Sequence, residues 1–231
     1  MLVVKLVGGL ASQLHKYAVG RALAERMDTV LLLDTSSYLG ATPKEAFPLE
    51  INHFHIEARA ATPEEIAIAK GKAAAALHQL CRLTGRQPSP KLEKRVLRWF
   101  GHTQYKANIT KGRTEHFFED VPRGKNAYIH GEWGAGFGLF EDIRPLLLQE
   151  LQLKSLSEEA LIIKKLIAKE PAATSLHVRR GDYVSNPAAA KLHGTSPVDY
   201  YRAAVAHIQQ WVAEPRFFIF SDDLTWCREN L

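Results

Sequence analysis

The residues best suited to chemistry form the sequence HVRRGDYV at positions 177–184. The preceding residues, 172–176, predict a short strand that runs up to this sequence. In open α/β sheets, ligands bind in the crevice outside the carboxyl ends of the strands. Two adjacent arginines there, Arg179 and Arg180, suit a diphosphate, because each guanidinium offers a planar fork of donors and keeps its charge. Gly181 allows a sharp turn or a close approach of the backbone to a ligand.

The arginine pair also has a simpler explanation. Most Arg-Arg pairs are solvated cations, and Gly-Asp is common in turns. Taken alone, RRGD therefore does not separate a binding site from a surface turn, and other parts of the chain must decide.

Several further stretches repeat, in order, the motifs of one enzyme family. The stretches are KLVGGLASQL at 5–14, YAVGRALA at 17–24, HVRRGDYV at 177–184, HGTS at 193–196, DYY at 199–201 and FFIFSDDL at 217–224. Together they resemble the α-1,2-fucosyltransferases of glycosyltransferase family 11, whose HxRRGDY motif is matched by the third stretch. The resemblance spans the chain and is thin between roughly residues 40 and 125.

The resemblance implies an α/β fold of the GT-B type with two Rossmann-like domains. Residues 1–153 would form the N-terminal, acceptor-side domain, and residues 154–231 the domain that binds the GDP-sugar. The implied reaction is inverting transfer of fucose from GDP-fucose to the 2-hydroxyl of a galactoside. The implied partners are GDP-fucose and a galactose-containing acceptor, such as a glycan or a lipopolysaccharide.

The resemblance also implies roles for individual residues. Arg179 would bind the β-phosphate and stabilise the charge of the departing diphosphate, whereas Arg180 would brace the site through a carboxylate partner. Asp182 would contact the fucose or its loop and is a candidate general base; a base elsewhere, or none, is the alternative. The other residues expected to contact the nucleotide are Gly8, Gly9, His177, Ser221, Asp222 and Asp223.

No metal and no cofactor other than the donor sugar nucleotide are expected. Metal-dependent glycosyltransferases of the other common fold use an Asp-x-Asp site, and the chain contains no Asp-x-Asp. Asp222 and Asp223 have a second interpretation, because aspartates at a strand end often cap the next helix. The two cysteines, Cys81 and Cys227, are too few for a zinc cluster or a disulfide framework.

The glycine turn belongs to a strand–turn–helix–strand unit. Residues 2–7 predict a strand, 12–27 a helix and 30–34 a second strand, which together indicate a parallel sheet. Gly8-Gly9 would either turn backbone amides toward a ligand or make an ordinary tight turn. The family's GGLGNQMFQYA is GGLASQLHKYA here, so Ala11 replaces a glycine, and a left-handed backbone there would be strained. We expect nucleotide binding to survive these changes, whereas the acceptor preference no longer follows from the resemblance.

The rest of the chain continues the α/β pattern. The predicted elements are helices over 62–83, 140–151, 155–167 and 196–212, strands over 127–130, 172–177 and 216–220, and a last helix that begins near 221. Only two strands follow residue 154, where a nucleotide-binding domain has about five or six. The family's later Asn-Ser-Ser-Phe-Ser-Trp-Trp motif is absent. We therefore expect a C-terminally truncated member with an incomplete second domain, and a non-catalytic nucleotide-sugar or glycan-binding relative is the alternative function.

The composition of the chain limits the kinds of partner that we expect it to bind. The 231-residue chain has a net charge of +5, which favours anionic ligands, but it carries no nucleic-acid-binding motif. No run of 18 apolar residues and no signal peptide occurs, so we expect a cytoplasmic protein. A basic run between Arg82 and Arg98 would either touch an anionic membrane at its inner face or form the solvated side of a helix.

Overall fold

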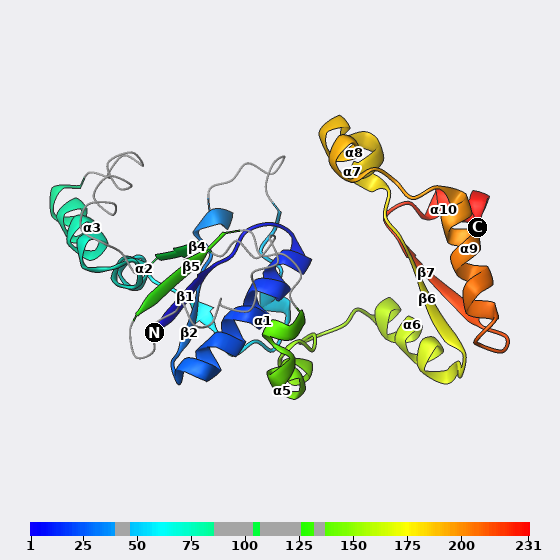
Figure 1. Cartoon of the computed structure of the whole chain (residues 1–231), viewed down its shortest axis with the longest axis horizontal. Helices are drawn as coiled ribbons and strands as arrows, with labels where there is room; N and C mark the ends of the chain where they lie inside the picture. The colour runs from blue at the N-terminus through cyan, green and yellow to red at the C-terminus, as the bar shows by residue number, and fades with distance from the viewer. Residues whose placement is uncertain (40–46, 86–103, 107–125, 132–136) are drawn as a thin grey trace. The chain divides into compact units, whose positions relative to one another are not determined.

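The computed structural model describes residues 1–39, 47–85, 104–106, 126–131 and 137–231 (Figure 1). They form two compact units, Met1–Ser155 (unit 1) and Leu156–Leu231 (unit 2). Most of the predicted basic run, from Arg86 to Arg98, lies outside the described residues. None of the described helices is long and apolar enough to cross a bilayer.

Unit 1 is built on a parallel sheet with the strand order β3-β2-β1-β5-β4 (Figure 1). Its strands are β1 (Leu2–Lys5), β2 (Leu31–Asp34), β3 (Arg59–Ala60), β4 (Gln104–Lys106) and β5 (Ala127–His130). The predicted parallel sheet is confirmed, although the first strand ends at Lys5, before residue 7. β3 and β4 were not predicted, because strands of two and three residues are too short to show an alternating pattern.

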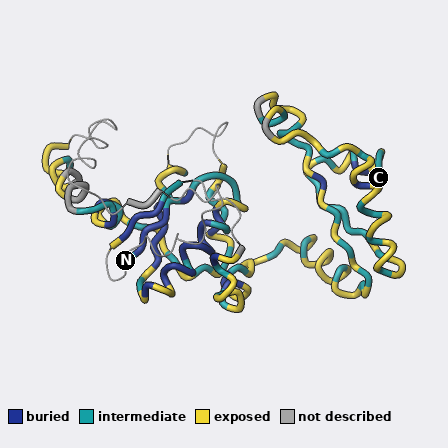
Figure 2. The backbone as a smooth tube through the Cα atoms, viewed as in Figure 1, coloured by how far each residue is buried: buried dark blue, intermediate teal, exposed yellow. Residues whose placement is uncertain are grey.

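Both faces of this sheet are covered by helices. One face packs on α1 (Leu10–Met27) and α5 (Arg144–Glu150), and the other on α2 (Pro63–Lys70). The residues of β1 and β2 and most of β5 are therefore buried (Figure 2), and these strands are largely continuous apolar runs. α1 lies close to the sheet at Gly20, where an added Cβ would sit 2.8 Å from Cγ2 of Val4.

Two predicted helices differ from the structure. The helix predicted over 62–83 is two helices, α2 and α3 (Lys72–Thr84), because Gly71 between them has φ 116°, outside the range of a helix. The capping box at its start is present: Thr62 and Glu65 exchange side-chain and backbone hydrogen bonds. The helix predicted from residue 140 begins with the 3-10 turns Phe137–Leu139 and Glu141–Ile143, and only α5 is α-helical.

Buried polar side chains hold the N-terminal turn and α5 against α1. The side-chain nitrogen of Gln13 donates to the carbonyls of Gly8 (3.0 Å) and Pro48 (2.8 Å). Its side-chain oxygen, Oε1, accepts from the backbone N–H groups of Glu50 and Ile51. Gln13 is fully buried, and these four bonds satisfy its amide completely.

A second buried contact joins α1 to α5. The Tyr17 hydroxyl donates to Glu150, and Arg21 Nε lies 3.0 Å from Oε1 of the same carboxylate. Burial and the hydrogen bond to Glu150 both raise the pKa of Tyr17, so its hydroxyl remains a proton donor. Gln13 and Tyr17, which match the family's opening motif, therefore act on the fold of unit 1.

Unit 2 contains the two predicted strands, β6 (Ala173–Val178) and β7 (Arg216–Ser221), which pair in parallel. Its helices are α6 (Glu158–Lys169), α7 (Gly181–Ser185), α8 (Pro187–His193), α9 (Val198–Gln209) and α10 (Leu224–Asn230). The core is small: Val178, Tyr201 and Cys227 are buried, and Leu176, Ile219 and Trp226 pack against them.

The apolar side of α6 is only partly buried. Leu156, Ala160 and Ile167 are half-buried, but Ile163 is 46% exposed and no residue of α6 is fully buried. Figure 2 shows unit 2 mainly in the colours of intermediate and exposed residues. A sheet of two strands presents too little surface to bury the apolar side of this helix.

The contact between α1 and the sheet gives a test of the fold. Gly20→Val should lower the free energy of unfolding by about 1–3 kcal/mol, because the added side chain would overlap Val4 and Leu31. Thermal and chemical unfolding of the purified chain measure this loss. Gly138→Val is the control, since an added Cβ at Gly138 meets no atom within 4 Å. Equal stability of the two variants would contradict the close packing of α1.

Candidate active site

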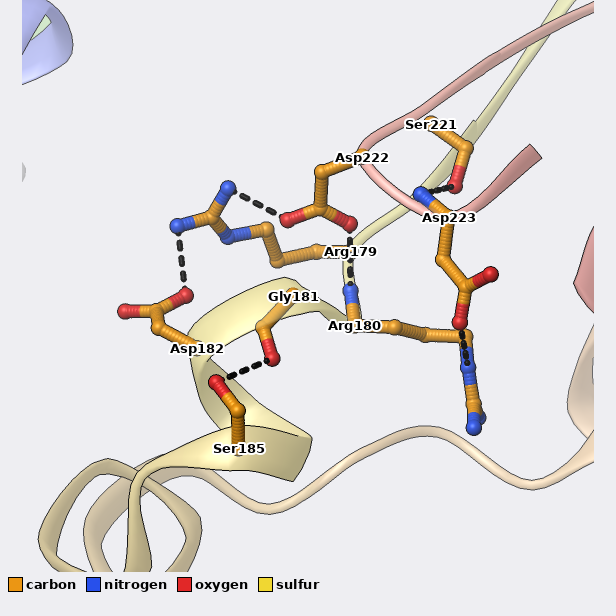
Figure 3. A network of polar contacts seen from close by, with 8 residues as sticks. All are labelled: Arg179, Arg180, Gly181, Asp182, Ser185, Ser221, Asp222 and Asp223. Carbon is orange, nitrogen blue, oxygen red and sulfur yellow. Dashed lines mark hydrogen bonds and ion pairs between the residues drawn. The ribbon is translucent and has the colours of Figure 1, made fainter. Parts of the chain in front are cut away.

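Parallel pairing of β6 and β7 brings the RRGD and SDD sequences to the same edge of the sheet (Figure 3). The last register pair is Val178 with Ser221, so the residues that follow each strand emerge side by side. They form a group of five charged residues, which we call the arginine–aspartate cluster: Arg179, Arg180, Asp182, Asp222 and Asp223.

Arg179 is held between two carboxylates. Its Nη1 lies 2.5 Å from Oδ2 of Asp222, and its Nη2 lies 2.6 Å from Oδ1 of Asp182. The guanidinium also lies over the ring of Tyr183, at 5.4 Å from the ring centroid. The side chain is 45% exposed, so Arg179 is fixed in direction and still open to solvent.

The side chain of Arg180 is more buried than that of Arg179 and contacts other parts of the fold. Its Nε lies 3.1 Å from Oδ2 of Asp223, which is the carboxylate partner that this arginine was expected to have. Its guanidinium stacks over Trp226 at 4.1 Å from the ring centroid, and only 17% of the side chain is exposed. Arg180 thus links the end of β6 to α10.

Asp222 connects the backbone of one strand end to the other. Its Oδ1 accepts from the backbone N–H of Arg180 at 2.8 Å, and its Oδ2 binds Arg179. A Cβ added at Gly181 would lie 2.6 Å from Oδ2 of Asp222, so the glycine makes room for this carboxylate. Burial opposes the charge, but the backbone N–H groups of Arg180 and Gly181 and the charge of Arg179 outweigh it and hold the pKa of Asp222 below its usual value.

Asp223 caps the following helix, which was one of its two interpretations, and it also pairs with Arg180. Its Oδ1 accepts from the backbone N–H of Trp226 at 3.0 Å and caps α10, while its Oδ2 binds Arg180. Ser221 supports this turn, because its Oγ accepts from the backbone N–H of Asp223 at 2.9 Å.

The remaining predicted residues lie outside this cluster. His177, near the end of β6, is exposed, and its side chain makes no hydrogen bond within the described ranges. Gly8 and Gly9 belong to unit 1. Gly8 has φ 83°, and its carbonyl accepts from Gln13 and from the hydroxyl of Tyr38 at 2.9 Å. Gly9 is the N-cap of α1 in an extended conformation.

The strain expected at Ala11 does not arise. Ala11 is the second residue of α1 and has no left-handed backbone. Ala11 is thus compatible with this turn, and the positive φ of the turn is carried by Gly8.

Unit 1 also contains a cavity of about 510 Å³ between α1 and α5. None of its lining residues was predicted to bind a ligand. They are mainly apolar: Leu14, His15, Ala18, Phe140, Glu141, Arg144, Leu147, Leu148 and Leu151.

Sequence reasoning missed the aromatic residues of the site. Tyr183 and Trp226 lie against the two arginines. Tyr183 belongs to the HxRRGDY motif, but no role was predicted for it or for Trp226. Trp226 follows Asp223 at the spacing of a capped N-terminus, which was the available signal. Within the described ranges, no group of three or more His, Cys, Asp or Glu is arranged to hold a metal ion; the absence of a metal requirement stays a prediction.

The lowered pKa of Asp222 leads to a pH-dependent stability. A carboxylate whose pKa is lower in the folded state stabilises the fold above its unfolded pKa of about 4, and this contribution is lost as the pH falls through the folded pKa. Asp222→Asn should therefore unfold at a lower temperature than the wild type at pH 7, and the difference should shrink below pH 4. Thermal unfolding between pH 3 and pH 7 measures both. Asp199→Asn, at a carboxylate that is 89% exposed, is the control; a difference for Asp222→Asn that does not change with pH would contradict the assignment.

Comparison with known proteins agrees with this geometry. The sequence profile described as glycosyl transferase family 11 matches residues 90–231, which include the whole arginine–aspartate cluster. The chain is 28% identical to the O-antigen biosynthesis glycosyltransferase WbnK of Escherichia coli over 97% of its own length and 74% of that protein. It is also 28% identical to an alpha-1,2-colitosyltransferase of Escherichia coli, over 99% of its own length and 71% of that protein.

No solved structure matches the chain. The family match covers more than half of the sequence and coincides with the strand-end arginines on which the site is built. The chain therefore belongs to glycosyl transferase family 11.

Proposed function

We propose that this glycosyltransferase moves fucose from GDP-fucose to the 2-hydroxyl of a galactoside, with inversion. The observation that carries the proposal is the arginine–aspartate cluster at the carboxyl ends of two parallel strands. Two guanidinium groups in this position suit the diphosphate of a sugar nucleotide. The acceptor is a glycan of the O-antigen type, in keeping with the name of one relative.

The two units take different substrates in this proposal. Unit 2 binds GDP-fucose through the arginine–aspartate cluster, with His177 and Ser221 beside it. Unit 1 serves the acceptor, as the N-terminal domain of a GT-B enzyme does. The parallel sheets of both units support this division.

The two arginines have different roles in the proposed reaction. When the bond between fucose and the β-phosphate breaks, negative charge grows on the departing GDP, and a cation already in place stabilises it without rearrangement. Arg179 has this role because its guanidinium is oriented but open to solvent. Arg180 is packed between Asp223 and Trp226 and holds the turn. Asp182 reaches the sugar, as contact or as general base, and no metal is needed.

A second donor has its own support. One relative is named for the transfer of colitose in α-1,2 linkage. GDP-colitose is therefore the alternative donor, and it differs from GDP-fucose in the sugar alone. The arginine–aspartate cluster would bind the diphosphate of either.

Nucleotide choice tests the proposal. GDP should bind more tightly than UDP or ADP, without added metal ions, and the chain should transfer sugar from GDP-fucose or GDP-colitose to a galactose-terminated acceptor. Calorimetry measures the first result, and detection of an α-1,2-linked product the second. Equal affinity for the three nucleotides, or a requirement for manganese, would exclude this function; tight GDP binding without transfer to any galactoside would identify a binding protein.

The different surroundings of the two arginines lead to different mutant effects. Arg179→Ala should weaken GDP binding by about 1.5–3 kcal/mol, the usual loss for a hydrogen bond to a charged group, with little change in melting temperature. Arg180→Ala should lower the melting temperature as well, because it exposes Trp226 and leaves Asp223 unpaired. Calorimetry and thermal unfolding of both variants give the comparison. Wild-type GDP affinity in a folded Arg179→Ala protein would show that this residue does not bind the phosphate.

A further inference from the structure

The arginine–aspartate cluster carries more negative than positive charge. Two guanidinium groups face the carboxylates of Asp182, Asp222 and Asp223, which gives the group a net charge of −1. A diphosphate carries at least two further negative charges. In the arrangement seen here, the electrostatic energy of the cluster therefore opposes the ligand that its arginines should bind.

Two of the five N–H donors of Arg179 are engaged in the same arrangement. A phosphate binds arginine best through two parallel N–H···O bonds from one edge of the guanidinium. Both terminal nitrogens of Arg179 are already engaged, Nη1 by Asp222 and Nη2 by Asp182. A phosphate that binds these nitrogens must share each with a carboxylate, and the negative charge of that carboxylate opposes its approach.

The two carboxylates are not held equally. Asp222 also accepts from the backbone of Arg180 at 2.8 Å, and it lies against Gly181, where an added Cβ would be 2.6 Å from Oδ2. Its side chain is 26% exposed. The carboxylate of Asp182 is 45% exposed and, within the described ranges, has Arg179 as its only hydrogen-bond or ion-pair partner. The bond to Asp182 is thus the one that can open without disturbing the backbone (Figure 3).

We infer that Asp182 is an exchangeable carboxylate that occupies Arg179 in the absence of donor and is displaced by the β-phosphate, whereas Asp222 is a permanent positioning residue. The inference rests on the proposed diphosphate site and adds its mode of regulation. Displacement removes one negative charge from the cluster and frees Nη2 of Arg179. The released carboxylate of Asp182 is then available for the sugar contact, so the arrival of the donor prepares the site for the next step.

Changing Asp182 or Asp222 to asparagine should have opposite effects on GDP affinity, although both changes remove one negative charge. Asp182→Asn should tighten GDP binding about two- to fivefold, the range expected for loss of a half-exposed ion pair. Asp222→Asn should weaken GDP binding by about threefold or more, because Arg179 loses the partner that orients it. Affinity for GMP, which lacks the β-phosphate, should stay within about twofold of the wild type in Asp182→Asn.

The measurement is calorimetric titration of the full chain with GDP and with GMP at pH 7, after thermal unfolding has confirmed that each variant is folded. Glu170→Gln is the matched control, because it removes an ion pair with Arg216 (3.2 Å) at the opposite end of the same two strands. Asp182→Ala repeats the test without any side-chain acceptor and should also bind GDP more tightly.

The possible failures can be told apart. Absence of GDP binding in the wild type and in every variant would refute the proposed function, and the inference with it. If the wild type binds GDP and Asp182→Asn binds it no more tightly, Asp182 does not compete with phosphate, while the proposed function stands. If both asparagine variants tighten GDP binding equally, only net charge matters, and the distinction between the two aspartates is wrong.

Discussion

The carboxylate of Asp222 joins two segments that are more than 40 residues apart in the sequence, and the geometry of the site depends on it. Asp222 follows β7, yet its partners are the side chain of Arg179 and the backbone of Arg180, which follow β6. A carboxylate held by backbone N–H groups and a guanidinium keeps its charge, as its lowered pKa indicates. The direction of Arg179 and the turn at Gly181 both follow from this contact.

The neighbouring contacts give Arg180 a structural role. Arg180 is enclosed by the carboxylate of Asp223 and the ring of Trp226, and Asp223 in turn caps α10. Asp222 and Asp223 therefore lie between β7 and α10, and their negative charges balance the positive charges of Arg179 and Arg180. In the proposed reaction, stabilisation of the departing diphosphate requires cations whose positions are set before the reaction, and these contacts fix the positions of both arginines.

The two units are stabilised by different kinds of contact. In unit 1, helices cover both faces of a parallel sheet, and the buried side chains of Gln13, Tyr17 and Glu150 bind the surrounding turns to α1. Unit 2 has a three-residue buried core beside two strands. Arg180 and Asp223 join the end of β6 to α10, so some residues of the candidate site also stabilise the unit that carries them.

The sequence by itself determined the local features: the strand–glycine turn–helix unit, the parallel character of the sheet, the capping box at Thr62 and the strand that leads to the RRGD sequence. These features depend on residues close together in the chain, which is why their patterns were readable. The family also followed from short ordered motifs.

Only the tertiary structure decided which partner each charged residue has. Nothing local assigns Asp222 to Arg179 and Asp223 to Arg180, or places Trp226 beneath the second arginine. Nor does the sequence show that Gly181 makes room for a carboxylate, or that Gly71 interrupts a helical pattern. These outcomes depend on the register between β6 and β7 and on side chains brought together from distant segments, because burial and hydrogen bonding act between neighbours in space, whatever their separation along the chain.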